Sequence, residues 1–225
     1  MTGTSPSRPK APLAGGLLLL GAVLMFAGGG TPFMTSLGRE VWNLRGTDQL
    51  VAIAAAQTAW SWANGLILAG TILTLAGLAA ALPWLESHQV PAGIRWMAVG
   101  VFYAGSALWM AALVGRLSVT LWAAELARDN SPLALVYEGF DRFQERALDV
   151  FMILGLASLA VLGATLARMA LRMWGVALVA VGAIGLGLTL VAERIPAFVY
   201  VGTAVLGVAL LTTPSTQPTM DRARR

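Results

Sequence analysis

The sequence predicts an all-α integral membrane protein built as a bundle of six transmembrane helices. Two observations lead to this prediction: apolar residues make up 57% of the chain, and its mean hydropathy is +0.74. Charged residues make up only 12% of the chain, about half the share that is usual in soluble domains. Because 225 residues cannot hide so much apolar surface in one water-soluble core, lipid is the solvent that fits the excess.

The apolar residues form long runs rich in Leu, Ala and Gly, as spanning helices require. The first run follows Arg8 and Lys10, so a cleaved signal peptide with a small-residue site at 27–29 is one alternative. The run continues through Phe33 and Met34, and we interpret it as a retained helix. The predicted spans lie at about 13–33, 62–84, 96–122, 147–168, 172–192 and 195–213.

Three of the predicted helices are too long for a bilayer. Each has roughly 37 residues, or about 55 Å of helix, whereas the hydrocarbon core is about 30 Å thick. Thr47 or Asp48 is expected to cap the first of them, and Ser131 followed by Pro132 the last. These three continuous helices are expected over 47–84, 91–129 and 131–168. The excess predicts a helical cap on one side of the membrane, formed by 35–61 and 123–146.

The distribution of basic residues predicts the orientation, because cytoplasmic segments carry an excess of Lys and Arg. The tails 1–12 and 214–225 are expected in the cytoplasm, with the cap outside a plasma membrane or cell inner membrane. The cytoplasmic segments would then hold Arg8, Lys10, Arg95, Arg168, Arg172, Arg222, Arg224 and Arg225. The outer side would hold Arg39, Arg45, Arg128, Arg142, Arg146 and Arg194. Tryptophan, which prefers interfaces, is expected to mark the two boundaries with Trp84, Trp96 and Trp174 and with Trp60, Trp62 and Trp122.

A charged residue inside an apolar run is a candidate functional residue, because a charge in lipid is costly. Arg116 is such a residue, and counting turns from the cytoplasmic ends places it at the height of Asp149 and Asn64. We predict an ion pair between Arg116 and Asp149 near the outer interface, with Asn64 close by. Two alternatives remain open: the guanidinium extends to the outer headgroups, or it finds another partner.

A second candidate is a polar seam on the second predicted span. Such residues commonly join helices by hydrogen bonds in lipid, and we favour that role over lining a ligand cavity. If a cavity exists, Trp60 and Trp109 are candidates for its walls, although we assign Trp60 to the aromatic belt. The seam consists of Gln57, Ser61, Asn64 and Thr71.

Four carboxylates share one face of the fourth predicted helix, at spacings of three and four residues. Carboxylate oxygens suit a hard divalent cation, but Arg142 and Arg146 lie beside them and can neutralise them. We therefore interpret this acidic stripe as a solvated or partner-facing surface and predict no metal site. The stripe consists of Glu138, Asp141, Glu145 and Asp149.

Missing residue types narrow the functional classes. The chain has no cysteine and a single histidine, His88, so thiolate chemistry and bis-histidine haem ligation are excluded and no cofactor is expected. The net charge of only +4 argues against a nucleic-acid partner. No catalytic residue is predicted. The small-residue pairs Gly100/Ala104 and Ala183/Gly187 are expected at close helix contacts, and they also allow a homo-oligomer.

The function class that the sequence favours is non-enzymatic binding. An amphipathic cap beyond the bilayer suits a partner protein or a lipid-like ligand at the outer face. A small-solute or ion transporter using the polar layer is the first alternative, although transporters usually place their sites near the midplane between repeats. A membrane enzyme acting on lipid or envelope substrates through its carboxylates is the second alternative.

Overall fold

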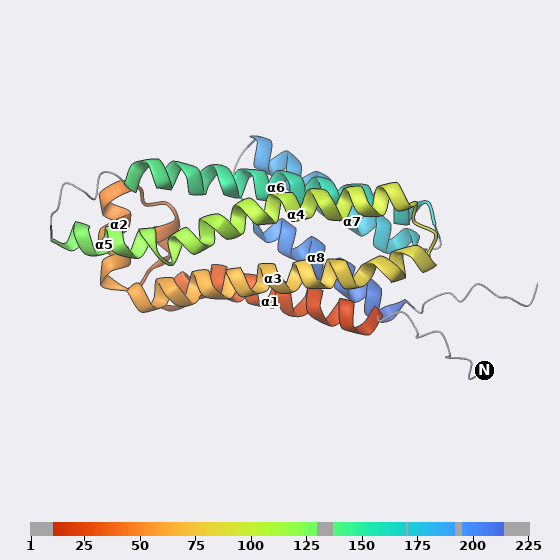
Figure 1. The fold of residues 1–225 in the computed structure, drawn as a ribbon, viewed down its shortest axis with the longest axis horizontal. Coiled ribbons are helices and arrows are strands. Elements are labelled where there is room, and N and C mark those ends of the chain that lie inside the picture. The colour runs from red at the N-terminus through yellow and green to blue at the C-terminus, as the bar shows by residue number, and fades with distance from the viewer. Residues whose placement is uncertain (1–10, 130–136, 170, 192–194, 214–225) are drawn as a thin grey trace, which may run out of the picture.

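The computed structural model describes residues 11–129, 137–169, 171–191 and 195–213, and these residues contain helices and no strands. In chain order the helices are α1 (Ala11–Met34), η1 (Arg39–Trp42), α2 (Gly46–Ala55), α3 (Gln57–Ser87), α4 (Ala92–Arg116), α5 (Val119–Arg128), α6 (Tyr137–Ala167), α7 (Arg172–Val191) and α8 (Ala197–Thr212). The long helices α1, α3, α4, α6, α7 and α8 alternate in direction along an elongated bundle, whereas α5 continues in the direction of α4 and α2 lies across one end (Figure 1).

Five helical segments of the described chain are long and apolar enough to cross a membrane: α1, α3, α4 with α5, α6 and α7. The chain is therefore a multi-pass helical membrane protein. With 16 residues, α8 is about 24 Å long, which is somewhat less than the hydrocarbon thickness. It is nevertheless apolar and packs against α1 and α7 inside the bundle.

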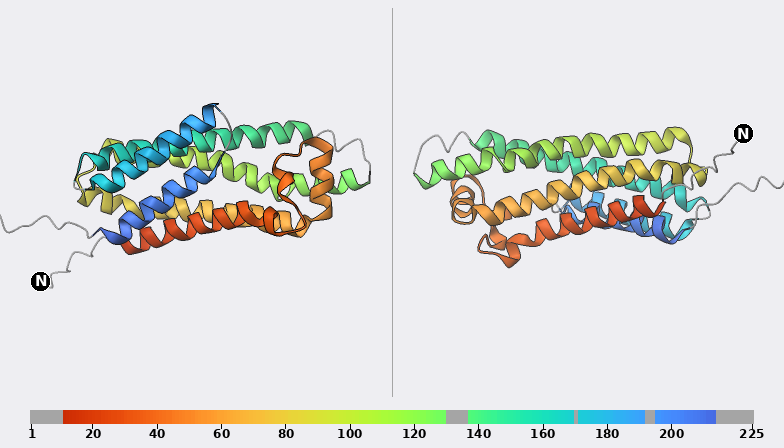
Figure 2. Two further views of the ribbon diagram at one scale, coloured as in Figure 1. Left: turned by 180° about the vertical axis from the view of Figure 1, so that it is seen from behind. Right: turned by 60° about the horizontal axis from the view of Figure 1, so that its bottom comes forward.

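Helix pairs hold the bundle together: α1 lies along α3, α4 along α6, and α6 along α7. The first turns of α1 and the last turns of α8 meet at one end of the bundle, as both views in Figure 2 show. Gly15 of α1 lies directly against Gly207 and Leu211 of α8 at this end. The outer surface is rich in apolar side chains, among them Val176 and Ile184 of α7, which face away from the bundle.

The apolar interior is divided into two clusters. The larger one fills the bundle and includes Trp84, Phe102 and Phe151. The second lies at the opposite end from the start of α1 and the end of α8, where α2 crosses α5 (Figure 1). Its buried residues are Leu37, Val41, Leu50, Ile53, Ala54, Ala56, Trp60, Ala123, Ala124, Ala127 and Tyr137. We call η1, α2, α5 and the first turns of α3 and α6 the cap.

Two of the three long helices predicted from the sequence are interrupted. The segment expected over 47–84 breaks at Ala56, whose φ of −141° and ψ of 42° are not helical. The segment expected over 91–129 breaks between Arg116 and Val119, where Ser118 has φ −128° and ψ −72°. A straight helix would carry the apolar face of α2 away from α5, whereas the break lets the two form the cap core.

The capping predictions also need correction. The helix α2 begins at Gly46, and neither Thr47 nor Asp48 is its N-cap. Gly46 has a φ of +56°, which glycine adopts without the strain that a side chain would add. The predicted cap at Ser131 and Pro132 lies outside the described residues.

Small residues bring the helix backbones close together, but not at the pairs that the sequence suggested. Gly100 and Gly187 face open space, so the expectation for them was wrong. The close contacts lie elsewhere: Gly21 meets Gly70 between α1 and α3, and Gly175 of α7 lies against the backbone of α6. Lipid provides little hydrophobic force between helices, so such contacts carry much of the association energy.

A valine at Gly175 should destabilise the bundle, because its Cβ would collide with the backbone of Ala167 on α6. Overpacking of this kind typically costs about 1–3 kcal/mol. We expect a lower midpoint of thermal unfolding in detergent for Gly175→Val. Gly187→Val is the matched control in the same helix, because nothing lies within 4 Å of its added Cβ. Equal midpoints for the two variants would contradict the α6–α7 packing.

Candidate functional site

The cap joins the bundle at Arg116, the last residue of α4. The final carbonyl groups of a helix lack N–H donors from their own helix. Here the indole Nε1 of Trp60 donates to the backbone oxygen of Arg116 at 2.9 Å. This bond links the first turn of α3 to the break between α4 and α5.

The guanidinium of Arg116 is surrounded by aromatic rings from three segments. Its Cζ atom lies 5.0 Å from the ring centroid of Trp109, 5.7 Å from that of Trp42 and 5.8 Å from that of Trp60. Each such contact contributes about 0.5–1 kcal/mol, and more where water is excluded. Because Trp42 belongs to the cap and Trp109 to the bundle, the cation holds the two parts together.

A buried hydrogen-bond network completes the surroundings of this cation. Arg116 Nε donates to Gln144 Oε1 on α6 at 2.6 Å. The amide nitrogen of Gln144 donates in turn to Tyr137 Oη at 3.0 Å, and Thr120 Oγ1 of α5 donates to the same oxygen at 3.2 Å. A satisfied network of this kind fixes the relative position of the elements that contribute to it.

The predicted ion pair between Arg116 and Asp149 is not present. Among the described salt bridges, Asp149 pairs with Arg146 at 3.5 Å, and Arg116 binds Gln144 instead. Gln144 is five residues beyond Asp149, or about 7.5 Å along α6. Counting turns gives the height of a Cα atom, whereas the long arginine side chain extends its guanidinium by about another turn towards the cap.

The acidic stripe is paired with arginines. Glu145 binds Arg45 of the cap at 2.9 Å, and Glu138 lies 4.0 Å from Arg142 one turn along α6. Asp141 is partly buried and interacts electrostatically with Arg45 and Arg116. Exposed pairs such as Glu138–Arg142 contribute little to stability.

The polar seam of α3 divides between the interior and the surface. Asn64 is fully buried, and its Nδ2 donates to Trp60 O at 2.9 Å, while its Oδ1 has no hydrogen-bond partner among the described residues. Thr71 is also buried and donates to Ile67 O at 2.8 Å. Gln57 and Ser61 instead line a groove on the outside of the bundle. The predicted site residues therefore do not form one constellation.

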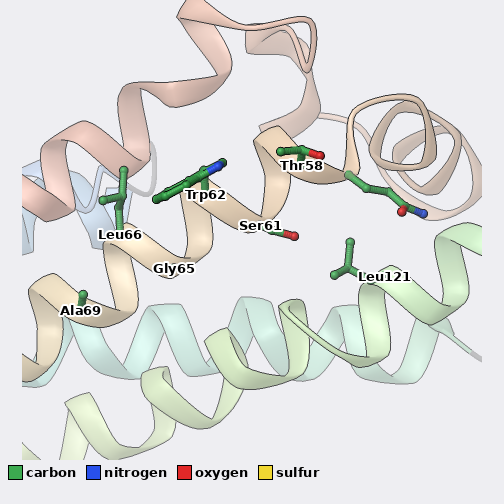
Figure 3. A pocket seen from close by; sticks show the side chains of 8 residues that line it. Thr58, Ser61, Trp62, Gly65, Leu66, Ala69 and Leu121 are labelled. Atoms are coloured by element: carbon green, nitrogen blue, oxygen red, sulfur yellow. The ribbon is translucent and has the colours of Figure 1, made fainter.

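The groove that contains Gln57 and Ser61 lies between α3 and α5 and has a volume of about 600 Å³. Figure 3 shows Trp62 and Leu66 on one side of it and Ser61 with Leu121 on the other. Gly65 forms part of its floor, and no atom lies within 4 Å of a Cβ built there. We call this the α3–α5 groove; its lining is Gln57, Thr58, Ser61, Trp62, Gly65, Leu66, Ala69 and Leu121.

A second groove of about 590 Å³ lies between the end of α1 and the corner where α2 meets α3. It shares Gln57, Thr58 and Trp62 with the first groove, so Trp62 stands between the two. We call it the α1–α3 groove; its lining is Thr31, Thr35, Ser36, Ala54, Ala55, Ala56, Gln57, Thr58, Ala59 and Trp62.

The tryptophans do not all behave as interfacial residues. Trp62 and Trp96 are 63% and 62% exposed, and their position at the two membrane boundaries stays a prediction. Trp60 and Trp84 are almost fully buried, so their assignment to the aromatic belt was wrong. Trp60 and Trp109 both lie against the Arg116 guanidinium, and neither lines one of the two described grooves.

Sequence reasoning missed the partner of Arg116 and the hydroxyl residues that line the α1–α3 groove. Gln144 lies between two members of the acidic stripe, and its position beside charged residues gave no reason to single it out. The hydroxyls of Thr31, Thr35 and Ser36 lie at the end of an apolar run. Such residues are common where a helix ends, so their presence there did not indicate a groove. No family model, curated protein or solved structure matches the chain.

Replacing Trp60 by phenylalanine should loosen the cap selectively. The variant keeps an aromatic ring beside Arg116 but loses the N–H that bonds to its carbonyl oxygen, at a cost of about 1 kcal/mol. We expect faster hydrogen exchange of backbone amides in α2 and α5, with unchanged exchange in α7. Trp122→Phe is the control, because Trp122 is 52% exposed. Unchanged exchange in the cap would show that this bond does not hold it in place.

Proposed function

We propose that this protein binds a membrane lipid, without chemical turnover, in the α3–α5 groove beside the cap. The observation that carries the proposal is the change in character along the groove. Its lining begins with Gln57, Thr58 and Ser61 at the cap end and continues with Leu66 and Ala69 towards the middle of α3. A lipid has the same order of polar headgroup and apolar chain.

The position of the groove also fits a lipid. It lies on the outer surface of α3, one of the helices that can cross a membrane. The exposed Trp62 lies at its edge, and tryptophan is enriched where the headgroups meet the hydrocarbon. An acyl chain could therefore enter sideways from the bilayer and leave the headgroup beside the cap.

The size of the groove is suitable for an ordered ligand. Small-molecule sites usually enclose about 300–1,000 Å³, and the α3–α5 groove has about 600 Å³. Gly65 keeps the floor low, because any side chain there would project into this space. The remaining wall comes from Leu121 of α5, which belongs to the cap. Binding would therefore depend on the cap being docked on the bundle.

The proposal includes a topology of six spans with both termini in the cytoplasm and the cap outside a plasma membrane. Support comes from α8, which returns from the end of α7 to the end of the bundle where α1 begins (Figure 2). An even number of crossings brings the two chain ends to the same side. The surplus of basic residues in the tails and in the α3–α4 and α6–α7 turns favours the cytoplasm for that side.

Single cysteines test this topology cleanly, because the natural chain has none. Thr47 is exposed in the cap and Ala92 is exposed at the opposite end of the bundle. We expect a membrane-impermeant maleimide to label Thr47→Cys in intact cells and to label Ala92→Cys only after permeabilisation. The reverse pattern would place the cap in the cytoplasm, and labelling of both in intact cells would contradict a transmembrane bundle.

Filling the groove should abolish lipid binding without unfolding the protein. Gly65→Leu places a branched side chain in the floor, where there is open space and therefore no clash. We expect at least tenfold less co-purified lipid, measured by mass spectrometry after detergent exchange, because the acyl chain loses its site. The midpoint of thermal unfolding in detergent should remain unchanged.

Gly100→Leu is the matched control, since Gly100 is an exposed glycine of α4 with no atom near an added Cβ. It adds the same apolar side chain to the membrane-facing surface of another span. Retention of lipid by Gly100→Leu together with its loss in Gly65→Leu would support the groove as the site. Equal lipid retention by both variants and the wild type would overturn the proposal.

A further inference from the structure

We infer that the lipid carries an uncharged headgroup rich in hydroxyls, such as a glycosyl group, and that this headgroup lies in the α1–α3 groove against Trp62. The inference rests on the proposed function and names the class of its ligand. It follows from three features of the described residues. The two grooves adjoin, one hydroxyl of the α1–α3 groove can still accept a hydrogen bond while another can still donate one, and the indole ring of Trp62 is exposed between the grooves.

The two grooves are adjacent along one side of α3. Gln57, Thr58 and Trp62 contribute to both, so a single ligand can extend from one into the other past the indole. The α3–α5 groove provides the aliphatic residues Leu66 and Leu121, whereas the lining of the open α1–α3 groove includes alanines and hydroxyl side chains. The apolar chain therefore belongs in the first groove and the headgroup in the second.

The described lining of the α1–α3 groove offers polar side chains without charge. Threonine and serine hydroxyls and the Gln57 amide each act as both donor and acceptor. Phosphate headgroups are usually bound by arginine or lysine, which form charge-assisted hydrogen bonds. Neither groove has such a residue in its described lining. The side chains present match a headgroup that also both donates and accepts, which is the property of a polyol.

Hydrogen bonds within the protein sharpen this preference. Thr31 donates its hydroxyl proton to Ala27 O at 2.9 Å, so the lone pairs of its oxygen remain available as acceptors. Thr35 Oγ1 accepts from the backbone nitrogen of Leu37 at 3.4 Å, which leaves its own proton available. A sugar hydroxyl can donate to the first and accept from the second. The oxygens of a phosphodiester can only accept, so they could bond to Thr35 but not to the Thr31 oxygen.

The exposed ring of Trp62 supplies the remaining contact. Its side chain is 63% exposed although it stands between two grooves, and it stays clear of the aromatic cage that holds Trp60. An indole carries negative charge density on its face, and the C–H face of a pyranose ring is weakly positive and flat. Stacking of the two would place the sugar hydroxyls at the rim of the ring, within reach of the neighbouring threonines.

The test is a competition between chain-matched lipids for the full-length protein in detergent micelles. Equimolar diglucosyl diacylglycerol and phosphatidylcholine, whose headgroup has no hydroxyl, are added, and the bound lipids are counted by native mass spectrometry. We expect at least a tenfold preference for the glycolipid. Trp62→Leu should reduce this preference at least fivefold while the protein still binds lipid, and Trp122→Leu should leave it unchanged.

A second variant separates the hydrogen bonds from the stacking. Thr31→Val preserves the shape of the side chain and removes the acceptor oxygen, so it should also lower the glycolipid preference. Equal binding of both lipids, or a preference for phosphatidylcholine, would overturn the headgroup inference. If that occurs while Gly65→Leu still abolishes lipid binding, the proposed function stands; if the wild type binds neither lipid, both fail.

Discussion

The contact between the Arg116 guanidinium and its three surrounding indoles is the constraint on which the position of the cap depends. A cation at the edge of a lipid-embedded bundle loses much of its hydration, and the loss must be offset locally. Among the described residues the compensation comes from aromatic faces and one amide oxygen of Gln144, with no carboxylate in direct contact. The contact lies where α4 ends, at Arg116, and there it joins the cap to the bundle.

The same contact sets the orientation of the candidate binding surface. Trp60 is turned inward, where its ring meets the guanidinium and its indole nitrogen bonds to the end of α4. Residues two apart on a helix point about 200° from each other, so fixing Trp60 inward directs Trp62 outward between the two grooves. The floor residue Gly65 then faces the gap to α5. The contacts of Trp60 with Arg116, together with the packing of α3 along α1, fix the rotation of α3 and with it the outward position of Trp62.

The sequence predicted the membrane class and the apolar segments well, because long Leu-, Ala- and Gly-rich runs admit few other structures. It also indicated that Arg116 is important, since a charge within such a run has a cost that is independent of fold. It could not predict the breaks at Ala56 and Ser118, because neither residue is a strong helix breaker and the breaks are driven by the packing of α2 on α5. It also missed the partner of Arg116, since Coulomb attraction favoured Asp149 whereas the reach of the side chain favoured Gln144.

The distribution of polar groups favours lateral binding over passage through the bundle. A transporter needs polar groups near the midplane that face a cavity opening to alternate sides. Here Arg116 lies beyond the end of α7. Gly185 of α7 packs against Leu156 of α6, so the last turn of α7 reaches about residue 150 of α6. That level is roughly 9 Å short of Gln144, the residue that binds Arg116. The guanidinium is enclosed by rings and bonded to Gln144. Accessible hydroxyls and amides of the described residues line the two outer grooves instead. A ligand that approaches from the lipid phase can satisfy them without any helix moving, which is why a lipid suits this architecture better than a transported solute.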